Sequence, residues 1–186
     1  MLLLEFIFGD SLMKLYISIG LLFSFFISST SLYAQSVTNL KIDTGQYLSD
    51  VQAAHTLRSQ RRVTEEDFIE MSNDKNTIIL DARSANKYQQ MHIVGSKNLP
   101  FTDFTVDALK STIPSTDTRI LIYCNNNVAN SPVAFADKAP AASLNLATYP
   151  SLYTYGYRNV FELGPVIDPA KSKIKFEGSL VEAVQK

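Results

Sequence analysis

Two short apolar runs constrain the fold of this chain more than any other feature. Residues 77–82 read TIILDA and residues 119–123 read RILIY, and in neither run do apolar and polar side chains alternate. A strand with such a run is buried on both faces, as the central strands of a parallel sheet are. Helical patterns separate and follow the two runs. The order of strand, helix and strand therefore predicts an α/β fold built on a parallel sheet.

Capping residues predict where the helices of the first half begin. Thr64, with Asp67 three residues later, has the form of a capping box and predicts a short helix. Ser84 is placed to cap a helix through ANKYQQM, and residues 105–113 form another helical stretch before a proline. Between these two helices, residues 92–100 (HIVGSKNLP) predict a strand that a glycine interrupts.

The second half contains one clear helix start and one clear helix end. Ser131 and Pro132 are a good N-cap and N1 pair, so we expect a helix through PVAFADK whose N-terminus points at the loop after residues 119–123. A further helix is expected over residues 144–155, with Gly156 as its C′ residue. The segment RNVFEL that follows predicts the last strand.

Composition excludes several classes of function. The chain has 17 lysines and arginines against 18 aspartates and glutamates, so it has no net field that would gather nucleic acid or an anionic membrane surface. A lone cysteine cannot contribute to a cysteine cluster for a metal, and no phosphate-loop or dinucleotide-binding motif is present. We therefore expect no metal, no cofactor and no nucleic acid partner.

The first residues are typical of an export signal. Leu15–Ile27 is an uncharged, largely apolar stretch that is short for crossing a bilayer, and Lys14 stands directly before it. Ala34 is a small residue at the position before a signal peptidase cut. We expect residues 1–34 to be a signal peptide, with Met13 as a more natural start, and the mature protein to be periplasmic or secreted without stable membrane insertion. The alternative is an uncleaved anchor or an N-terminal core helix.

The remaining chain divides into three parts. Residues 35–62 are an N-terminal extension whose stretch QYLSDVQAAHTLRSQRR predicts a helix. Residues 63–170 carry all the strands expected above and form the main domain. Residues 171–186 are a C-terminal tail, and the sequence leaves open whether this tail packs on the domain.

Cys124 is the residue around which a function is most easily built. It directly follows the run at 119–123, and ligands of parallel α/β sheets bind beyond the carboxyl ends of the strands. With one cysteine the chain has no internal disulfide, so the thiol is buried, paired with another molecule or used for chemistry. The alternative to a reactive thiol is a buried and inert one, since free cysteines are commonly part of a core.

These residues together resemble a known family. LDARSANKYQQMHIVGSKNLP is similar to the first motif of rhodanese-like domains, and ILIYC with GYRNVFELG resembles the second half of the same domain, so the resemblance covers about Val63 to Ile167. It implies a parallel sheet flanked by helices on both faces. It also implies a cysteine nucleophile, Cys124, that carries sulfane sulfur as a persulfide from a small sulfur donor to a thiol acceptor. Asp81 and Arg83 are implied to be a structural pair near the base of the domain, and His92 part of a turn.

The sequence departs from the family where the chemistry would occur. In the family a short loop with a glycine and a closing arginine follows the cysteine, and this chain has neither, while an insertion lies within residues 131–150. We expect the loop's peptide N–H groups and asparagine amides to hold a persulfide anion instead. This loop comprises Asn125, Asn126, Asn127, Val128, Ala129 and Asn130. Lys138 and Arg158 are candidates for the missing positive charge, and we expect weak affinity for thiosulfate.

Three functions follow from these observations. The first is an exported sulfurtransferase that uses Cys124 as its nucleophile. The alternative is a noncatalytic rhodanese-fold module for binding or interaction, which the absent arginine and the insertion favour. A minor alternative is a cysteine phosphatase, which shares the strand-loop-helix geometry but needs an arginine to close its phosphate loop. The sequence identifies no partner protein.

Overall fold

A computed structural model of the protein describes residues 39–184. The chain divides into two units, residues 1–42 and residues 43–186. In the first unit, residues 39–42 form a turn closed by a hydrogen bond from the Ile42 N–H to the Asn39 carbonyl (3.0 Å). The expected signal peptide and the alternative start at Met13 lie outside the described residues. Within residues 39–184, no helix is both long and apolar enough to cross a membrane.

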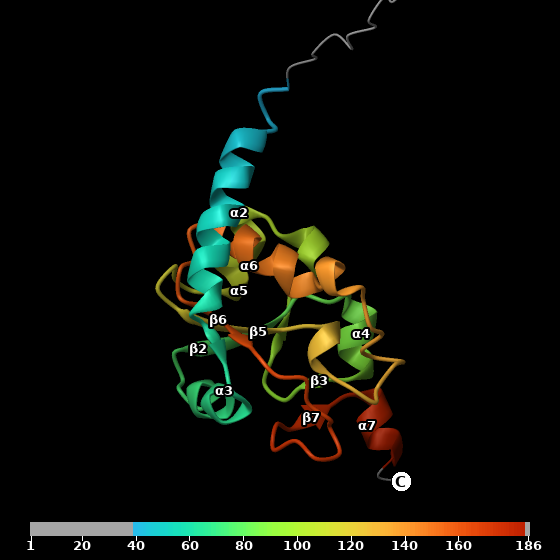
Figure 1. Ribbon diagram of the computed structural model, residues 1–186. Coiled ribbons are helices and arrows are strands. Elements are labelled where there is room, and N and C mark those ends of the chain that lie inside the picture. The colour runs from blue at the N-terminus through green and yellow to red at the C-terminus, as the bar shows by residue number, and fades with distance from the viewer. Residues whose placement is uncertain (1–38, 185–186) are drawn as a thin grey trace, which may run out of the picture. The chain divides into compact units, whose positions relative to one another are not determined.

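A five-stranded parallel sheet forms the centre of the second unit (Figure 1). Its order is β1-β6-β5-β2-β4, and every neighbouring pair is parallel. The two apolar runs are the adjacent central strands β2 and β5, in register from Thr77 opposite Arg119 to Asp81 opposite Tyr123. The predicted parallel α/β sheet is thus confirmed. The strands are β1 (Arg62–Val63), β2 (Thr77–Asp81), β4 (Lys97–Asn98), β5 (Arg119–Tyr123) and β6 (Val160–Leu163).

Helices cover both faces of the sheet, as expected (Figure 1). One face packs against three helices: α2 (Thr44–Ser59), α5 (Val106–Thr112) and α6 (Leu144–Thr154). The other face packs against α3 (Glu65–Ser72) and against a small antiparallel sheet of β3 (His92–Ile93) and β7 (Phe176–Glu177), with α4 (Ala85–Gln90) and α7 (Ser179–Val184) beside it. Three 3₁₀ turns complete the elements: η1 (Phe101–Asp103), η2 (Asn125–Asn127) and η3 (Pro140–Ala142).

The continuous apolar character of the central strands follows from these two layers. Successive side chains of a strand point to opposite faces, so Ile120 and Ile122 enter the core under α2, α5 and α6. Leu121 and Tyr123 enter the core on the opposite face. Because both faces are covered, β5 is buried from Ile120 to Tyr123, and its charged residue, Arg119, stands at the start of the strand.

The capping signals predict most helix starts correctly. The Thr64 hydroxyl accepts a hydrogen bond from the Asp67 N–H (3.1 Å), and α3 begins at the next residue. Thr105 caps α5 in the same way through the Ala108 N–H (3.2 Å). The helix expected at 144–155 is α6, and Gly156 follows it with a φ of +95°, a conformation that few other residues adopt at a helix end.

The expected helix after Ser131 does not form. Residues 131–139 make turns, and one helix-like hydrogen bond joins the Phe135 N–H to the Ser131 carbonyl (2.8 Å). Two carbonyls that the next helical turn would use accept from side chains instead, because Lys87 donates to Val133 and Arg83 donates to Ala134. Side chains from elsewhere in the fold therefore replace the N–H donors of the next helical turn, and the prediction from the capping pair was wrong.

The single strand expected over residues 92–100 is also wrong. This stretch forms two short strands that belong to different sheets, since β3 pairs with β7 and β4 pairs with β2. Between them Gly95 has a φ of +78°, and the Ser96 N–H donates to the Ile93 carbonyl (3.0 Å). The tight turn at Gly95 thus transfers the chain from one sheet to the other.

A buried ion pair attaches α2 to the sheet. The Arg58 guanidinium donates through Nε and Nη2 to the Glu162 carboxylate on β6, with 2.7 Å between Nη2 and Oε1. The Glu162 side chain is 4% exposed, so its charge depends on this partner. Ala54 adds a buried apolar contact, and the helix expected in the N-terminal extension therefore packs on the domain core.

Replacing Glu162 with glutamine should destabilise the protein strongly. The substitution leaves the Arg58 guanidinium, which is largely buried, without its counter-charge, and we expect a loss of about 3 kcal/mol in the free energy of unfolding. Urea titration followed by circular dichroism measures this loss. The matched control is Asp74→Asn, which neutralises one partner of the exposed Arg119–Asp74 pair and should cost less than about 1 kcal/mol. Equal losses in the two variants would contradict this account.

The described part of the C-terminal tail packs on the domain. β7 pairs with β3, and the Val94 N–H donates to the Lys175 carbonyl (2.9 Å). After β7 the chain turns at Gly178, whose φ is +127°. A Cβ atom at this position would lie 2.7 Å from the Gln90 carbonyl oxygen, which is closer than any real contact of that kind.

Replacing Gly178 with alanine should therefore loosen the tail from α4. The clash involves backbone atoms of Gln90, so side-chain rotation cannot relieve it, and we expect the Val94 amide hydrogen to exchange about tenfold faster or more. The control is Gly95→Ala, which has a positive φ of +78° but open space around the added methyl group. Amide exchange measured by NMR that is equally slow in wild type and Gly178→Ala would be inconsistent with the predicted clash.

Candidate functional site

Cys124 lies at the carboxyl end of β5, as expected from the sequence. Its N–H donates to the Asn127 side-chain oxygen (2.9 Å), and the residue is 1% exposed. Its Sγ lies 3.3 Å from the hydroxyl oxygen of Ser143, the residue that precedes α6. The sulfur is therefore buried, and its identified polar neighbour is a hydroxyl group from the far end of the insertion.

The N-terminus of a helix does meet the sulfur, but the helix is α6. Ser143 is the N-cap residue of α6, and its side chain makes no hydrogen bond to the first turn of that helix. Its hydroxyl lies next to Cys124 Sγ instead. The positive end of an 11-residue helix is thus placed where a thiolate or persulfide would carry its negative charge. The sequence predicted a helix N-terminus beside the cysteine, but assigned it to a helix that starts after Ser131. The insertion lies between the cysteine and α6, so the helix that reaches the sulfur begins later in the chain.

The asparagines after Cys124 are used mainly for structure. The Asn127 side chain accepts from Cys124 N–H and from Asn145 Nδ2 (3.2 Å), and it donates to the carbonyls of Leu163 (2.8 Å) and Pro165 (3.2 Å). These hydrogen bonds join the loop to the end of β6 and to the start of α6. Because both ends of the amide are engaged, Asn127 positions the cysteine loop and is not available to hold an anion.

Two further asparagines have separate roles. Asn130 has a φ of +58°, a left-handed conformation that asparagine tolerates, and its side chain donates to Asp168 (3.0 Å). Asn126 donates through Nδ2 to the Lys138 carbonyl (2.6 Å). Within the described part of the chain, its Oδ1 is buried and accepts no hydrogen bond. An unpaired buried acceptor of this kind is rare in folded proteins.

The expected cradle of peptide N–H groups is only partly available. The N–H groups of Asn127, Val128 and Ala129 donate to the carbonyls of Cys124 (3.1 Å), Asn125 (3.3 Å) and Ile167 (2.8 Å). Val128 also forms a parallel bridge with Ile167, which extends the sheet beyond the end of β5. Half of the six N–H groups in the loop are therefore committed to other acceptors, so an anion cradle over all of residues 125–130 is not the arrangement observed.

Asp81 and Arg83 form a buried ion pair at the same edge of the sheet as Cys124. The resemblance implied a structural pair near the base of the domain. The pair lies instead where β2 and β5 end, because Asp81 ends β2 opposite Tyr123 of β5. Tyr123 donates to the Asp81 carboxylate (2.5 Å), and its ring lies beneath the guanidinium at 5.5 Å. Burial raises the pKa of the Tyr123 phenol well above its usual value, and the charge of Asp81 raises it further.

His92 begins β3, just after α4, so it is part of a strand and not, as the resemblance implied, of a turn. Its ring stacks on Tyr88, with the ring centroids 3.7 Å apart. Its Nδ1 lies 2.7 Å from the Tyr88 carbonyl oxygen, and its Nε2 lies 3.2 Å from the Glu177 carboxylate on β7. Both ring nitrogens thus bond to neighbours that fix α4 and the tail, and the contacts of His92 are structural.

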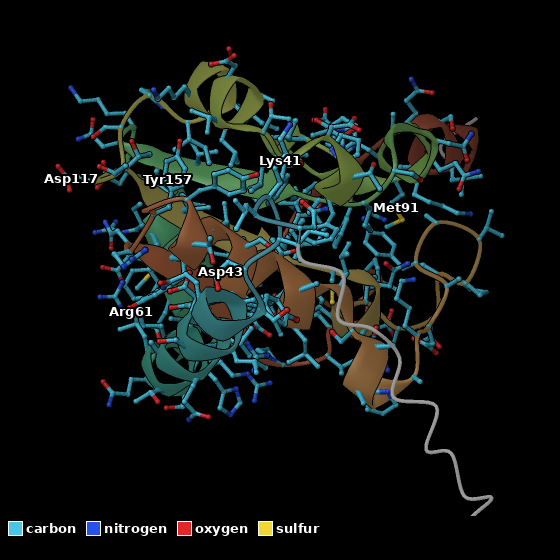
Figure 2. All side chains as sticks on the ribbon, turned by 90° about the horizontal axis from the view of Figure 1, so that it is seen from above. Lys41, Asp43, Arg61, Met91, Asp117 and Tyr157 are labelled. Atoms are coloured by element: carbon cyan, nitrogen blue, oxygen red, sulfur yellow. The ribbon has the colours of Figure 1, made fainter. Side chains whose placement is uncertain are left out.

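The two candidate cations lie in different places. Arg158 stacks over Tyr153 at 3.4 Å and donates to its carbonyl, at the C-terminal end of α6. Figure 2 shows the preceding residue, Tyr157, on the same side as Asp117, with Met91 on the opposite side. Arg158 therefore lies at the amino end of the strands, away from Cys124, and its candidacy was wrong. Lys138, in contrast, belongs to the segment that Asn126 contacts.

A cleft of about 440 Å³ lies beside the cysteine loop. Asn125 and Leu144, the neighbours of Cys124 and Ser143 in the chain, form one part of its wall, and Lys138 and Lys87 add positive charge. Arg83 also lines the cleft, but its charge is paired with Asp81. Among the residues described, no cluster of histidine, cysteine and acidic side chains is arranged to hold a metal ion.

Sequence reasoning missed the two residues that complete the surroundings of the cysteine. Ser143 and Asn145 lie 19 and 21 positions after Cys124. Asn145 is 1% exposed and bonds to Asn127, while Ser143 contacts the sulfur. The one signal for them was their position at the predicted start of the helix over 144–155. In a parallel α/β sheet, a helix that follows a strand begins near the carboxyl end of that strand, here β5.

Comparison with solved structures finds distant likenesses. The BH2092 protein from Bacillus halodurans is 20% identical with a TM-score of 0.46, over 72% of this chain and 88% of that chain. A rhodanese from E. coli, solved with anions, is 17% identical with a TM-score of 0.38, over 55% and 99%. The Rhodanese_3-like domain of an Anabaena sp. protein is 22% identical with a TM-score of 0.37, over 55% and 93%. No curated protein matches the chain.

A family model gives the clearer result. The model described as Rhodanese-like domain matches residues 64–163, which is more than half of the chain. The matched region runs from the cap of α3 to the end of β6 and includes both central strands, Cys124 and the insertion. The first motif, the cysteine after β5 and the strand expected at RNVFEL, which is β6, all fall within it, whereas β7 follows it. The chain therefore belongs to the rhodanese-like domain family.

Proposed function

We propose that this protein is an exported sulfurtransferase that carries sulfane sulfur as a persulfide on Cys124. The Cys124 thiolate attacks the outer sulfur of a small donor, a new S–S bond forms, and the donor leaves with the electron pair of its broken bond to sulfur. An acceptor thiolate then attacks the outer persulfide sulfur. The S–S bond to Cys124 breaks, and its electron pair returns to Cys124 as thiolate. No metal or cofactor takes part.

The position of the sulfur at the start of α6 carries this proposal. Cys124 Sγ lies beside the Ser143 hydroxyl, at the end of α6 where the helix dipole is positive. A hydroxyl can donate to a thiolate or persulfide, and the first N–H groups of a helix favour a negative charge nearby. This arrangement supports anion stabilisation even though no arginine closes the loop.

The positive charge available to a donor is limited. Lys87 and Lys138 line the neighbouring cleft, while Arg83 is neutralised by Asp81 and Arg158 lies at the other end of the sheet. A single ammonium group lacks the bidentate geometry with which a guanidinium holds a dianion. We therefore propose that thiosulfate is a poor donor for this protein and that polysulfides or organic persulfides are better ones. The same lack of an arginine argues against phosphatase activity.

The burial of the sulfur favours a second candidate, a noncatalytic module that binds a partner. Cys124 is 1% exposed, and half of the N–H groups that follow it are committed to carbonyls. A thiol that stays buried in solution reacts with no donor. In this case the domain would have the rhodanese-like fold without sulfurtransferase activity.

Treatment with sulfur donors should add one sulfur atom to Cys124. We expect polysulfide to convert most of the protein and thiosulfate to act at least about tenfold more slowly, because a charge-assisted bidentate bond is absent. Intact mass before and after cyanide treatment measures the added sulfur, which cyanide should remove. Cys124→Ser is the control and should gain nothing. If neither donor adds sulfur to a thiol confirmed as reduced, the noncatalytic candidate is correct.

Export should produce a shortened protein. When the full chain is expressed in a Gram-negative host, we expect the periplasmic fraction to contain protein that begins at Gln35, because the cut follows Ala34. Mass spectrometry of the purified protein gives its N-terminus. A full-length chain retained in the membrane fraction would support the uncleaved anchor instead.

A further inference from the structure

The segment between Phe135 and Ser143 differs from the rest of the domain in how it is held. All seven residues from 136 to 142 are exposed, and none belongs to either core cluster. The residues that flank the segment are firmly placed, because Phe135 is 1% exposed and Asn145 is 1% exposed. The segment therefore spans two fixed points without packing of its own.

One hydrogen bond ties this segment to the loop beside Cys124. Asn126 Nδ2 donates to the Lys138 carbonyl (2.6 Å), and in the described part of the chain no other hydrogen bond joins residues 136–142 to residues outside 135–143. At its end the segment leads into Ser143, whose hydroxyl lies against Cys124 Sγ. The weakly held stretch thus ends directly before the residue whose side chain lies against the buried sulfur.

The energetics of this contact favour easy release. Closing the segment makes the Asn126 hydrogen bond, but it also leaves Asn126 Oδ1 buried without a donor among the described residues. The net gain from one hydrogen bond is no larger than the cost of a buried unpaired acceptor. Opening would let water bond to both atoms of the amide, so the closed and open arrangements are close in free energy.

We propose that residues 136–142 are a flap that opens by itself, while the rest of the domain stays folded, and gives reagents access to Cys124. The flap turns about Phe135 and Leu144, so Ser143 moves away from Cys124 Sγ when the flap opens, and the Asn126 side chain is its latch. The role of the flap in sulfur transfer rests on the proposed function, because a closed flap would shield a persulfide from water and an open one would admit donor or acceptor. The opening motion itself stands independently of that reaction.

Alkylation of Cys124 in the full chain tests the flap. Iodoacetamide is neutral and small, and mass spectrometry gives the fraction of protein alkylated with time over a range of urea concentrations below the unfolding transition. Local opening exposes little surface, so the alkylation rate should hardly change with urea, whereas access through global unfolding would rise steeply. We expect a rate at least about tenfold below that of the unfolded chain and nearly independent of urea.

A matched pair of variants assigns the opening to this segment. The sequence contains two Pro-Ala pairs, Pro140–Ala141 within the flap and Pro169–Ala170 in a turn after β6. Glycine at both positions of the first pair increases the freedom of the open flap and should speed alkylation about tenfold. The same exchange in the second pair should leave the rate within about twofold of wild type, after correction for any change in global stability.

Three results would overturn the proposal. In the first, the alkylation rate follows the global unfolding equilibrium from zero urea upward. In the second, Cys124 is alkylated as fast as in the unfolded chain. In the third, the two double-glycine variants are alkylated at equal rates. None of these measurements involves a sulfur donor, so failure of sulfur transfer would leave the test of the flap intact. Conversely, a protein that forms a persulfide but alkylates only through global unfolding would refute the flap alone.

Discussion

The carboxyl edge of the sheet depends on one buried charge, the guanidinium of Arg83. It is 2% exposed, and a charge in that position must be paired and hydrogen-bonded in every direction. Asp81 supplies the counter-charge, and the carbonyls of Met91 (2.8 Å) and Ala134 (3.0 Å) accept from Nη2 and Nη1. The Phe135 ring lies 3.8 Å from the guanidinium carbon. One side chain thereby fixes the end of β2, the end of α4 and the first part of the insertion.

This pairing also explains the path of the chain around Cys124. Arg83 bonds to the Ala134 carbonyl and Lys87 to the Val133 carbonyl, and the insertion is irregular from there as far as η3. The chain then enters α6 with Ser143 beside the cysteine. An anion-stabilising helix terminus is thus retained at the sulfur, although the helix begins much later in the sequence than the capping pair indicated. The insertion is attached at Phe135 and free of the core beyond it.

Predictability differed between parts of the molecule for physical reasons. Apolar runs report burial directly, so β2 and β5 were found and their parallel pairing was correct. Thr64 acts on an N–H group three residues away, and its cap formed as predicted, while Thr105 caps the helix expected over residues 105–113 in the same way. Ser131 has the same local chemistry, but its helix was lost to bonds from Arg83 and Lys87, which are distant in sequence. The strand expected over residues 92–100 was lost for another reason, because the turn at Gly95 divides it between two sheets.

The sequence by itself determined the layered α/β fold, the family and the place of Cys124 at the carboxyl end of a central strand, because strand burial and caps depend on residues close together in the chain. The tertiary structure alone decided what surrounds the sulfur. Asn127 became a structural link, Ser143 became the neighbour of Sγ, and Arg158 was placed at the far end of α6. These outcomes depend on which carbonyls and side chains meet after folding, and no spacing within the sequence encodes such long-range competition for hydrogen bonds.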